Sequence, residues 1–580
     1  MSLFRVALAQ MNPTVGDLEG NARRIIDYME TARRAGADLV AFPELAVTGY
    51  PPEDLLLKPA FIADNLAVVR ALAPETKGLT AVVGFVDRDH DIYNAAAVFH
   101  DGSLAGVYRK VYLPNYGVFD EDRYFHPGRE QPVFVIGDVT IGVSICEDIW
   151  YPVGPASYQA KAGAQVLVNI NASPYHAGKR GQRERMLSTR AFDNEVLVCY
   201  VNAVGGQDEL VFDGASLVFD QGGRLLTRGR QFDEDLLVVD LDVDSVFRGR
   251  LHDPRGRKDE VFGVRDDVPT RRVILRQPGG TTPPKPPLPP REDRPLLTGE
   301  DEVYAALVLG TRDYVRKNGF EKVVIGLSGG IDSSLVAAIA TDALGPENVL
   351  GLSMPSRYSS EGSVTDALDL AARLGIRLTT IPIEPAFQAF LTMLEGPFRG
   401  TEPGITEENL QARIRGNIIM AFCNKLHCLA LTAGNKSEVA TGYATLYGAD
   451  TTGALSPIKD VPKTMVYRVA EARNRRSEVI PGSVLTKAPS AELKPDQRDT
   501  DTLPPYDVLD PILQAYVEED RSVAEIVAMG YSEETVSYVA RLVDRAEHKR
   551  RQAPPGIKVT PRAFGRDRRL PITSRYTSSP

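Results

Sequence analysis

The stretch SGGIDSS, residues 328–334, is the first place where this sequence could bind a reactive group. It follows an apolar strand-like run at 323–327 and leads into a helical pattern that begins near Asp332. Glycine lets the backbone approach a ligand or adopt positive φ, and the free amides at a helix start attract anions. A glycine-rich turn with a Ser or Asp cap would explain SGG alone, but the complete motif favours a phosphate-binding loop.

This predicted loop lacks the lysine that a Walker loop, GxxxxGK[ST], places at the outer phosphates. Asp332 takes part instead, and a carboxylate beside phosphates needs a cation between them, which predicts Mg²⁺. The motif resembles that of the N-type ATP pyrophosphatases. The resemblance implies that ATP is a co-substrate cleaved to AMP and pyrophosphate. The ATP-binding residues that it implies are Gly326, Leu327, Ser328, Gly329, Gly330, Ile331, Asp332, Ser333, Ser334 and Ala433.

A second candidate site combines Glu44, Lys110 and Cys146, each at or just past an apolar, strand-like run. A thiol becomes an effective nucleophile once a neighbouring base or cation favours its thiolate. Glu44 could take that proton and return it to a leaving amine, and Lys110 could stabilise an oxyanion. Taken singly, the three residues have plain explanations as a core cysteine, a surface lysine and a solvated glutamate.

In these contexts, the order Glu, Lys, Cys resembles the carbon–nitrogen hydrolase (nitrilase) superfamily over residues 1–270. The resemblance implies a four-layer α-β-β-α sandwich that cleaves amides and nitriles. Glu121, in FDEDRYF, matches the second glutamate of that family, which supports the lysine and the substrate. The absence of a histidine near Cys146 in the sequence fits a histidine-independent mechanism.

Alternating strand and helix patterns must position both sets of residues. In the N-terminal half, we predict a helix at 21–37 and strands at 4–10, 37–44, 79–86, 94–100, 139–145, 164–172 and 196–203. In the C-terminal half, strands at 321–328, 348–355 and 376–383 alternate with helices at 332–345 and 364–375. The first half therefore predicts an α/β layered domain, and the second a doubly wound parallel sheet with crossover helices.

The length of 580 residues also requires more than one hydrophobic core. Eight prolines between positions 278 and 295 predict an extended connector. We therefore expect a domain at 1–275, which the resemblance above implies to be of the carbon–nitrogen hydrolase type, a linker at 276–296 and a domain of the ATP pyrophosphatase type at 297–580.

The overall composition limits the partners and the compartment. A net charge of −10 argues against a nucleic-acid partner, and four cysteines are too few for a disulfide scaffold. No signal-peptide layout or membrane-spanning apolar run is visible. These features predict a cytoplasmic protein without a membrane partner.

Further motifs narrow the reaction. Residues 408–422, 431–448, 456–470 and 487–499, together with SGGIDSS, closely resemble the glutamine-dependent NAD synthetases over nearly the whole chain. The resemblance implies that ammonia from L-glutamine amidates deamido-NAD to NAD through an adenylated intermediate. It also implies a homo-oligomer. By position it implies glutamine binding by Tyr116, Ser173 and Lys179, deamido-NAD binding by Asn409, Glu438 and Lys558, and Mg²⁺ binding by Asp332 and Glu438.

Three departures from the family pattern affect these expectations. Ala433 replaces a frequent threonine, which removes a possible hydroxyl contact to ATP. The loop after Tyr447 is one residue longer, and Lys179 stands where arginine also occurs, although lysine cannot make a two-pronged contact. Lys179 and Lys558 could also be solvated surface lysines, but their flanking motifs favour binding.

Other functions remain open at this level. The pyrophosphatase half could serve a tRNA-modifying enzyme or an enzyme acting on another carboxylate, and the N-terminal half could be an assembly scaffold. Eleven Lys/Arg against three Asp/Glu in residues 541–575 could meet nucleic acid, a pyrophosphate-containing substrate or a neighbouring subunit. Cys423 and Cys428 could suggest a metal, but zinc usually takes four ligands and helix packing is favoured.

Overall fold

The computed structural model describes residues 3–253, 270–277, 285–291 and 295–577. Its contacts divide the chain into two compact units, one of residues 1–207 and 212–296 and the other of residues 208–211 and 297–580. None of the helices in the described ranges has the length and apolar character that crossing a bilayer requires.

Two large sheets form the centre of the first unit. One has the order β14-β1-β2-β3-β4-β5 and the other the order β13-β12-β9-β8-β7-β6-β15. The first contains β1 (Leu3–Gln10), β2 (Leu39–Ala41), β3 (Thr80–Arg88), β4 (Ile92–His100), β5 (Ser103–Arg109) and β14 (Asp235–Asp242). The second contains β6 (Val133–Ile136), β7 (Val139–Ile145), β8 (Val166–Asn171), β9 (Leu197–Asn202), β12 (Leu217–Phe219), β13 (Leu225–Arg228) and β15 (Arg272–Arg276).

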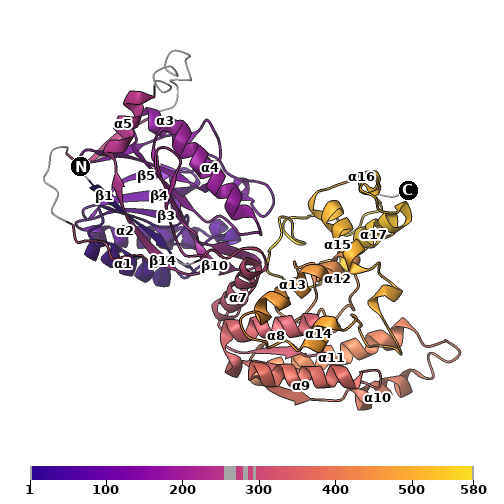
Figure 1. Cartoon of the computed structure of the whole chain (residues 1–580). Helices are drawn as coiled ribbons and strands as arrows, with labels where there is room; N and C mark the ends of the chain where they lie inside the picture. The colour runs from indigo at the N-terminus through magenta and orange to yellow at the C-terminus, as the bar shows by residue number, and fades with distance from the viewer. Residues whose placement is uncertain (1–2, 254–269, 278–284, 292–294, 578–580) are drawn as a thin grey trace. The chain divides into compact units, whose positions relative to one another are not determined.

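Alternation of side chains along the strands decides how these sheets are layered. Leu8 of β1 and Val168 of β8 belong to one buried cluster between the sheets. The opposite face of the first sheet packs against α1 (Leu18–Arg34) and α2 (Pro59–Leu72), and that of the second against α3 (Pro155–Lys161) and α4 (Lys179–Asn194). These helices lie on the two outer sides of the strands in Figure 1. The predicted four-layer α-β-β-α sandwich is confirmed.

The sequence patterns located the strands well and their ends less well. The strand predicted at 37–44 ends at Ala41, because Pro43 has no amide to donate and Leu45 has a φ of +48°.

Of the predicted linker, residues 278–284 and 292–294 lie outside the described residues. Its described part lies along β1, where Arg5 Nη1 donates to the carbonyl of Pro286 at 2.7 Å.

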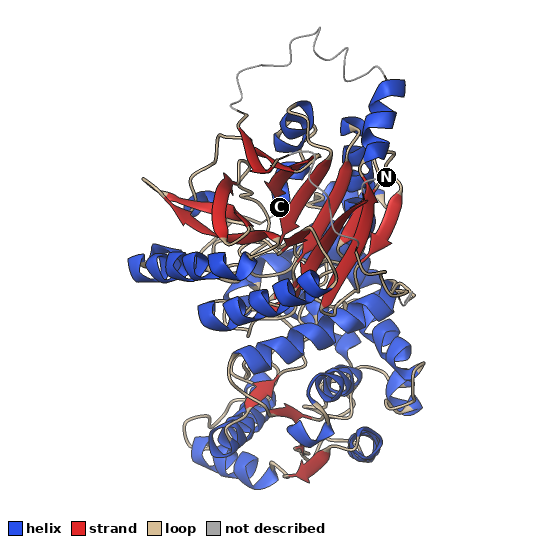
Figure 2. Ribbon diagram, turned by 90° about the vertical axis from the view of Figure 1, so that its left-hand side faces the viewer, coloured by secondary structure: helices blue, strands red, loops and turns tan. Residues whose placement is uncertain are grey.

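The second unit is built on a four-stranded parallel sheet of order β18-β17-β16-β19. The strands are β16 (Val323–Gly326), β17 (Val349–Ser353), β18 (Arg377–Thr380) and β19 (Leu429–Leu431). Helix α8 (Ile331–Leu344) packs on β16 and β17, α9 (Glu361–Leu374) on β17 and β18, and α11 (Ile405–Leu426) on β16 and β19. Helices surround these short strands in Figure 2, and the predicted doubly wound parallel sheet is confirmed.

Further helices complete the second unit: α7 (Gly299–Lys317), α10 (Glu384–Leu394), α12 (Lys436–Thr441), α13 (Lys463–Asn474), α14 (Gly482–Thr486), α15 (Tyr506–Leu513), α16 (Val523–Ala528), α17 (Glu533–Arg545) and α18 (Glu547–Arg550). The order of the sheet reverses direction at β16, since β17 and β18 lie on one side of it and β19 on the other. Ligands of open α/β sheets bind outside the carboxyl ends of the strands at such a reversal. We therefore expect the ligand-binding residues of this unit in the segments that follow β16 and β19.

Two candidate active sites

The first unit brings Glu44, Lys110 and Glu121 together in a buried cluster. Glu44 follows β2, and Lys110 follows β5. The Lys110 ammonium donates to Glu44 Oε1 at 2.7 Å and to both carboxylate oxygens of Glu121 at 2.8 Å. The three side chains are at most 5% exposed. The cluster therefore holds its charges away from water, where electrostatic interactions are strong.

Cys146 lies within the electrostatic reach of this cluster, directly after β7. Its φ of +43° is unusual for a residue with a side chain, and such strained positions are enriched at functional sites. Burial, and next the Glu44 carboxylate, raise the pKa of the Cys146 thiol well above its usual value, while Lys110 opposes them. The resting thiol is therefore protonated, and its reactivity depends on a base beside it.

The acidity of Glu121 is also altered by its surroundings. Burial raises the pKa of Glu121 to about 7, even though Lys110 favours its charged form. For Lys110, burial favours the neutral amine, but the charges of Glu121 and Glu44 outweigh it and raise the pKa. The ammonium thus remains charged, and one carboxyl group of the cluster titrates near neutral pH.

Three residues that the sequence did not single out complete this cluster. Asn94 of β4 donates to Glu44 Oε1 at 2.7 Å and to Glu121 Oε2 at 3.2 Å, and the Tyr50 hydroxyl donates to Glu121 Oε1 at 3.0 Å. The Asp148 carboxylate accepts from Ile145 N at 3.0 Å and from Tyr112 N at 2.9 Å. Asp148 thereby ties the Cys146 turn to the segment after Lys110. Of the three, only Asp148 has a local sequence signal, because it lies two residues after Cys146.

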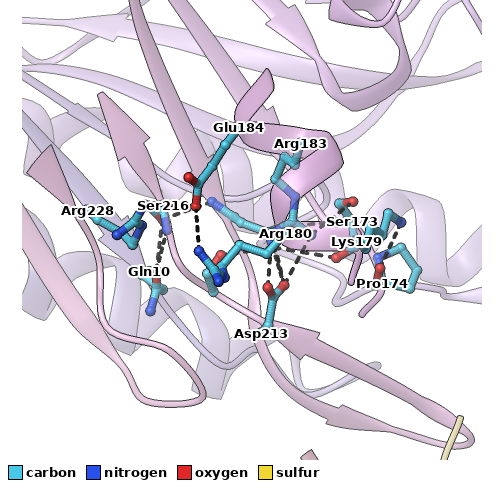
Figure 3. A network of polar contacts seen from close by, with 12 residues as sticks. Gln10, Ser173, Pro174, Lys179, Arg180, Arg183, Glu184, Asp213, Ser216 and Arg228 are labelled. Atoms are coloured by element: carbon cyan, nitrogen blue, oxygen red, sulfur yellow. Dashed lines mark hydrogen bonds and ion pairs between the residues drawn. The ribbon is translucent and has the colours of Figure 1, made fainter. Parts of the chain in front are cut away.

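The residues predicted to bind glutamine lie on two segments of the first unit. Tyr116 is 59% exposed, and its hydroxyl donates to Glu147 Oε2 at 2.9 Å, next to Cys146. Ser173 is buried two residues after β8, and Lys179 begins α4 and donates to the carbonyl of Pro174 at 2.7 Å. Figure 3 shows Ser173, Pro174 and Lys179 side by side. Lys179 is thus partly buried and hydrogen-bonded to the segment that carries Ser173.

In the second unit, the predicted phosphate loop connects β16 to α8. Gly329 has a φ of +77° and its Cα faces the backbone of Ser363. The hydroxyls of Ser333 and Ser334 donate to the carbonyl of Gly330 at 3.1 and 2.8 Å. These bonds fix the entry into a helix of 14 residues, whose first amides have no acceptor within the helix and favour an anion.

A lysine that the sequence did not single out lies between the two predicted metal ligands. Lys463, the first residue of α13, contacts Asp332 Oδ2 and lies 3.4 Å from Glu438 Oε1. Asn435 donates to Asp332 Oδ1 at 3.0 Å. Burial raises the pKa of Glu438 to about 8, and Asp332 adds to this against the effect of Lys463. Two carboxylates therefore share one ammonium beside the phosphate loop.

This pair of carboxylates suits a magnesium ion in its donor chemistry. Mg²⁺ usually takes one or two carboxylates and completes its shell with phosphate oxygens and water. Asp332 and Glu438 already converge on one positive charge at the loop, so a cation has the partners it needs there. Among the described residues, no group of three or more His, Cys, Asp or Glu side chains could hold a metal without help from a ligand.

The other residues predicted to contact nucleotides lie on separate segments of the second unit. Ala433 follows β19 at the carboxyl edge of the sheet, and Asn409 of α11 accepts from Thr445 Oγ1 at 2.9 Å. Lys558 is buried, donates to the carbonyls of Thr560 and Pro561 at 2.9 Å, and pairs with Asp567. The Lys558 ammonium is therefore directed to acceptors in its own segment. Cys423 is buried in an apolar cluster of this unit.

Comparison with known proteins identifies the family of each half of the chain. The family model described as carbon-nitrogen hydrolase matches residues 5–250, and the model described as NAD synthase matches residues 303–553. The chain is similar to proteins named glutamine-dependent NAD(+) synthetase from Thermotoga maritima, at 51% identity over 99% of both chains, and from Aquifex aeolicus, at 46% identity over 99% of this chain and 100% of that one.

A solved structure extends this likeness to three dimensions. The glutamine-dependent NAD+ synthetase of Acinetobacter baumannii, in complex with adenosine diphosphate, is 40% identical over the full length of both chains, with a TM-score of 0.74. The tRNA-modifying alternative is not favoured, because the relatives that span the whole chain carry the synthetase name. The chain therefore belongs to the family of glutamine-dependent NAD(+) synthetases.

Proposed function

We propose that this chain converts deamido-NAD to NAD with ammonia that it releases from L-glutamine, while ATP is cleaved to AMP and pyrophosphate. The observation that carries the proposal is the buried Lys110 ammonium between Glu44 and Glu121, beside Cys146. Such a site suits amide cleavage. The lysine-free phosphate loop and its two carboxylates suit adenylation in the same chain.

In the first unit, Cys146 Sγ attacks the side-chain amide carbon of glutamine, and Glu44 takes the thiol proton. A base is required because burial keeps this thiol protonated. Lys110 stabilises the oxyanion of the tetrahedral intermediate. Glu44 then gives its proton to the departing amine, so ammonia leaves and a thioester remains. Water activated by Glu44 cleaves the thioester, which releases glutamate and restores the thiol.

Tyr116, Ser173 and Lys179 are proposed to hold the glutamine. A free amino acid presents a carboxylate, and the partly buried Lys179 ammonium is a suitable partner for it. The exposed Tyr116 side chain donates to Glu147, the neighbour of Cys146, and is proposed to cover the substrate. Glu121 and Asn94 keep Lys110 and Glu44 in place during both steps.

In the second unit, the carboxylate of deamido-NAD attacks the α-phosphorus of ATP, and pyrophosphate leaves. Residues 326–334 are proposed to hold the phosphates through the first amides of α8 and the loop glycines. Ammonia then attacks the acyl-adenylate, forming the amide of NAD and expelling AMP. Asn409, Glu438 and Lys558 are proposed to contact deamido-NAD, and for Lys558 this requires exchange of its present partners.

Magnesium is proposed to be held by Asp332 and Glu438, where it would neutralise the phosphate charge that builds up on departure. Lys463 shares these carboxylates and supplies positive charge at the same place.

At Ala433, we propose that a backbone contact to ATP substitutes for the missing hydroxyl. We further propose a domain boundary at 276–296, a cytoplasmic location and a homo-oligomer, as the sequence predicts.

The direct test is an assay with deamido-NAD, ATP and Mg²⁺, with either glutamine or ammonium as nitrogen donor, and detection of products by mass. We expect NAD, AMP and pyrophosphate with both donors, and glutamate with glutamine. Formation of ADP and orthophosphate would contradict the adenylation step. Equal activity on a carboxylate other than deamido-NAD, or on tRNA, would contradict the proposed substrate.

A further inference from the structure

A buried ion pair behind the proposed glutamine site has no role in the mechanism above. Arg183 lies in the second turn of α4, and Asp213 is the last residue of β11 (Leu210–Asp213). Their side chains are 0% and 1% exposed, and both guanidinium Nη atoms lie 3.1 Å from the carboxylate. A buried ion pair is costly to desolvate, so stabilisation of the fold alone does not explain this one.

This ion pair reaches Ser173 by two routes. Arg183 Nη2 makes a long contact of 3.5 Å with Ser173 Oγ. Asn202 connects Ser173 to Asp213. Its Oδ1 accepts from Ser173 N at 2.9 Å, and its Nδ2 donates to Asp213 Oδ1 at 3.3 Å. Figure 3 shows Arg183 and Asp213 beside Ser173. The hydroxyl of Ser173 therefore contacts Arg183 directly, and its backbone amide is connected to Asp213 through Asn202.

The same helix also carries Lys179, four residues before Arg183, so that both lie on one face of α4. Arg183 thus anchors the helix whose first residue donates to Pro174, next to Ser173. An arginine has donors only, so Ser173 Oγ accepts from it and its own proton is directed elsewhere. Arg183 Nε has no hydrogen-bond partner among the described residues.

We propose that Arg183, oriented by Asp213, is a positioning residue that sets the Ser173 hydroxyl and the first turn of α4 for binding of glutamine. This inference rests on the proposed function, in which Ser173 and Lys179 hold the substrate. Arg183 does not touch the reacting atoms, so its loss should weaken glutamine binding more than the chemical step. The ammonium-supported reaction does not use the glutamine site, so loss of Arg183 or Ser173 should leave its rate unchanged.

A double-mutant cycle tests the coupling of Arg183 to Ser173. Arg183→Lys keeps a positive charge but loses the two-pronged contact. We expect it to raise the KM for glutamine about tenfold, as for one lost hydrogen bond to a charged group, with a much smaller change in kcat. Ser173→Ala should raise the KM similarly, and the double variant should raise it by less than the product of the two single effects, because part of the effect of Arg183 passes through Ser173.

A matched control lies on the outer side of the same helix. Arg228 of β13 pairs with Glu184 of α4 at 2.8 Å, and Figure 3 shows this pair near Arg183. Arg228→Lys makes the same chemical change to another arginine–carboxylate pair of α4, so the KM for glutamine should stay at its wild-type value. The rate with ammonium reports in each variant whether the second unit is folded, and the kcat for glutamine hydrolysis reports the same for the first unit.

The outcomes separate the inference from the function on which it rests. Additive effects of Arg183→Lys and Ser173→Ala, or an unchanged KM in Arg183→Lys, would overturn the positioning role alone. An unchanged KM in Ser173→Ala would overturn the proposed glutamine contact and the inference with it. If Arg183→Lys does not fold, Asp213→Asn is judged by the same cycle, because it releases Arg183 while preserving side-chain size.

Discussion

Replacement of Gly329 by alanine should disable the phosphate loop while leaving the first unit active. A Cβ atom built on Gly329 lies 2.1 Å from the carbonyl oxygen of Ser363, whereas real Cβ contacts are essentially never shorter than 3.0 Å. The loop or the start of α9 must therefore move by at least about 0.9 Å. The φ of +77° adds about 1–2 kcal/mol of strain for alanine.

The expected functional loss follows from this displacement. A misplacement of about 1 Å can lower a rate about 100-fold, because the reacting atoms are no longer aligned. We therefore expect Gly329→Ala to lower kcat for NAD formation about 100-fold with either glutamine or ammonium as donor. Glutamine hydrolysis, measured as glutamate, should persist in the same preparation and shows that the first unit is folded.

Gly375 offers a matched control for the strain itself. It ends α9 with a φ of +70°, and an added Cβ would meet only Pro346 Cβ at 3.9 Å, which is ordinary contact. Gly375→Ala should lose about 1–2 kcal/mol of unfolding free energy and keep the rate of NAD formation. Wild-type kcat in Gly329→Ala, or an equal loss in both variants, would refute the reasoning from the loop geometry.

Three further predictions follow from the two sites. Cys146→Ala should abolish glutamine-supported NAD synthesis and retain the ammonium-supported rate; equal loss of both would mean that the cysteine serves folding. Asp332→Asn should raise the Mg²⁺ concentration for half-maximal synthesis at least about tenfold, measured with ammonium as donor, and an unchanged requirement would exclude Asp332 as a ligand. Burial raises the pKa of Glu121 to about 7 and of Glu438 to about 8, from 4.5. Between pH 4.5 and these values the folded state holds protons that the unfolded chain releases, so stability is greatest at the acidic end and falls with rising pH, by at most about 1.4 kcal/mol per pH unit for each group. Urea unfolding from pH 5 to 8 should show a shallower fall in Glu121→Gln, and an identical pH dependence would contradict this assignment.

Local features of the chain were predictable because neighbouring residues decide them. The loop 328–334 follows from an apolar strand, glycines and a capped helix start, all within one short stretch. The parallel sheet and the layered domain followed from strand and helix periodicity, which the structure confirms. For Glu44, Lys110 and Cys146, the resemblance to a known family identified residues that are far apart in the sequence.

The remaining contacts of the sites depend on pairings that no local pattern specifies. Asn94 lies in the strand NAAAVFH, and only the pairing of β4 beside β5 brings its amide to Glu44 and Glu121. Lys463 meets Asp332 across 131 residues of sequence because α13 begins beside the phosphate loop. Lys558 remains a predicted ligand contact, and only the fold shows that its ammonium donates to the carbonyls of Thr560 and Pro561.

By itself, the sequence determined the two kinds of chemistry and the elements that carry them, since backbone conformation and residue type act over a few neighbouring positions. Tertiary structure alone decided which charges share a buried space and therefore which groups change their acidity. Burial raises the pKa of Glu121 and of Glu438, and each retains its partner lysine only because distant segments close around it. Desolvation and Coulomb interaction depend on distance in space, which separation along the chain does not determine.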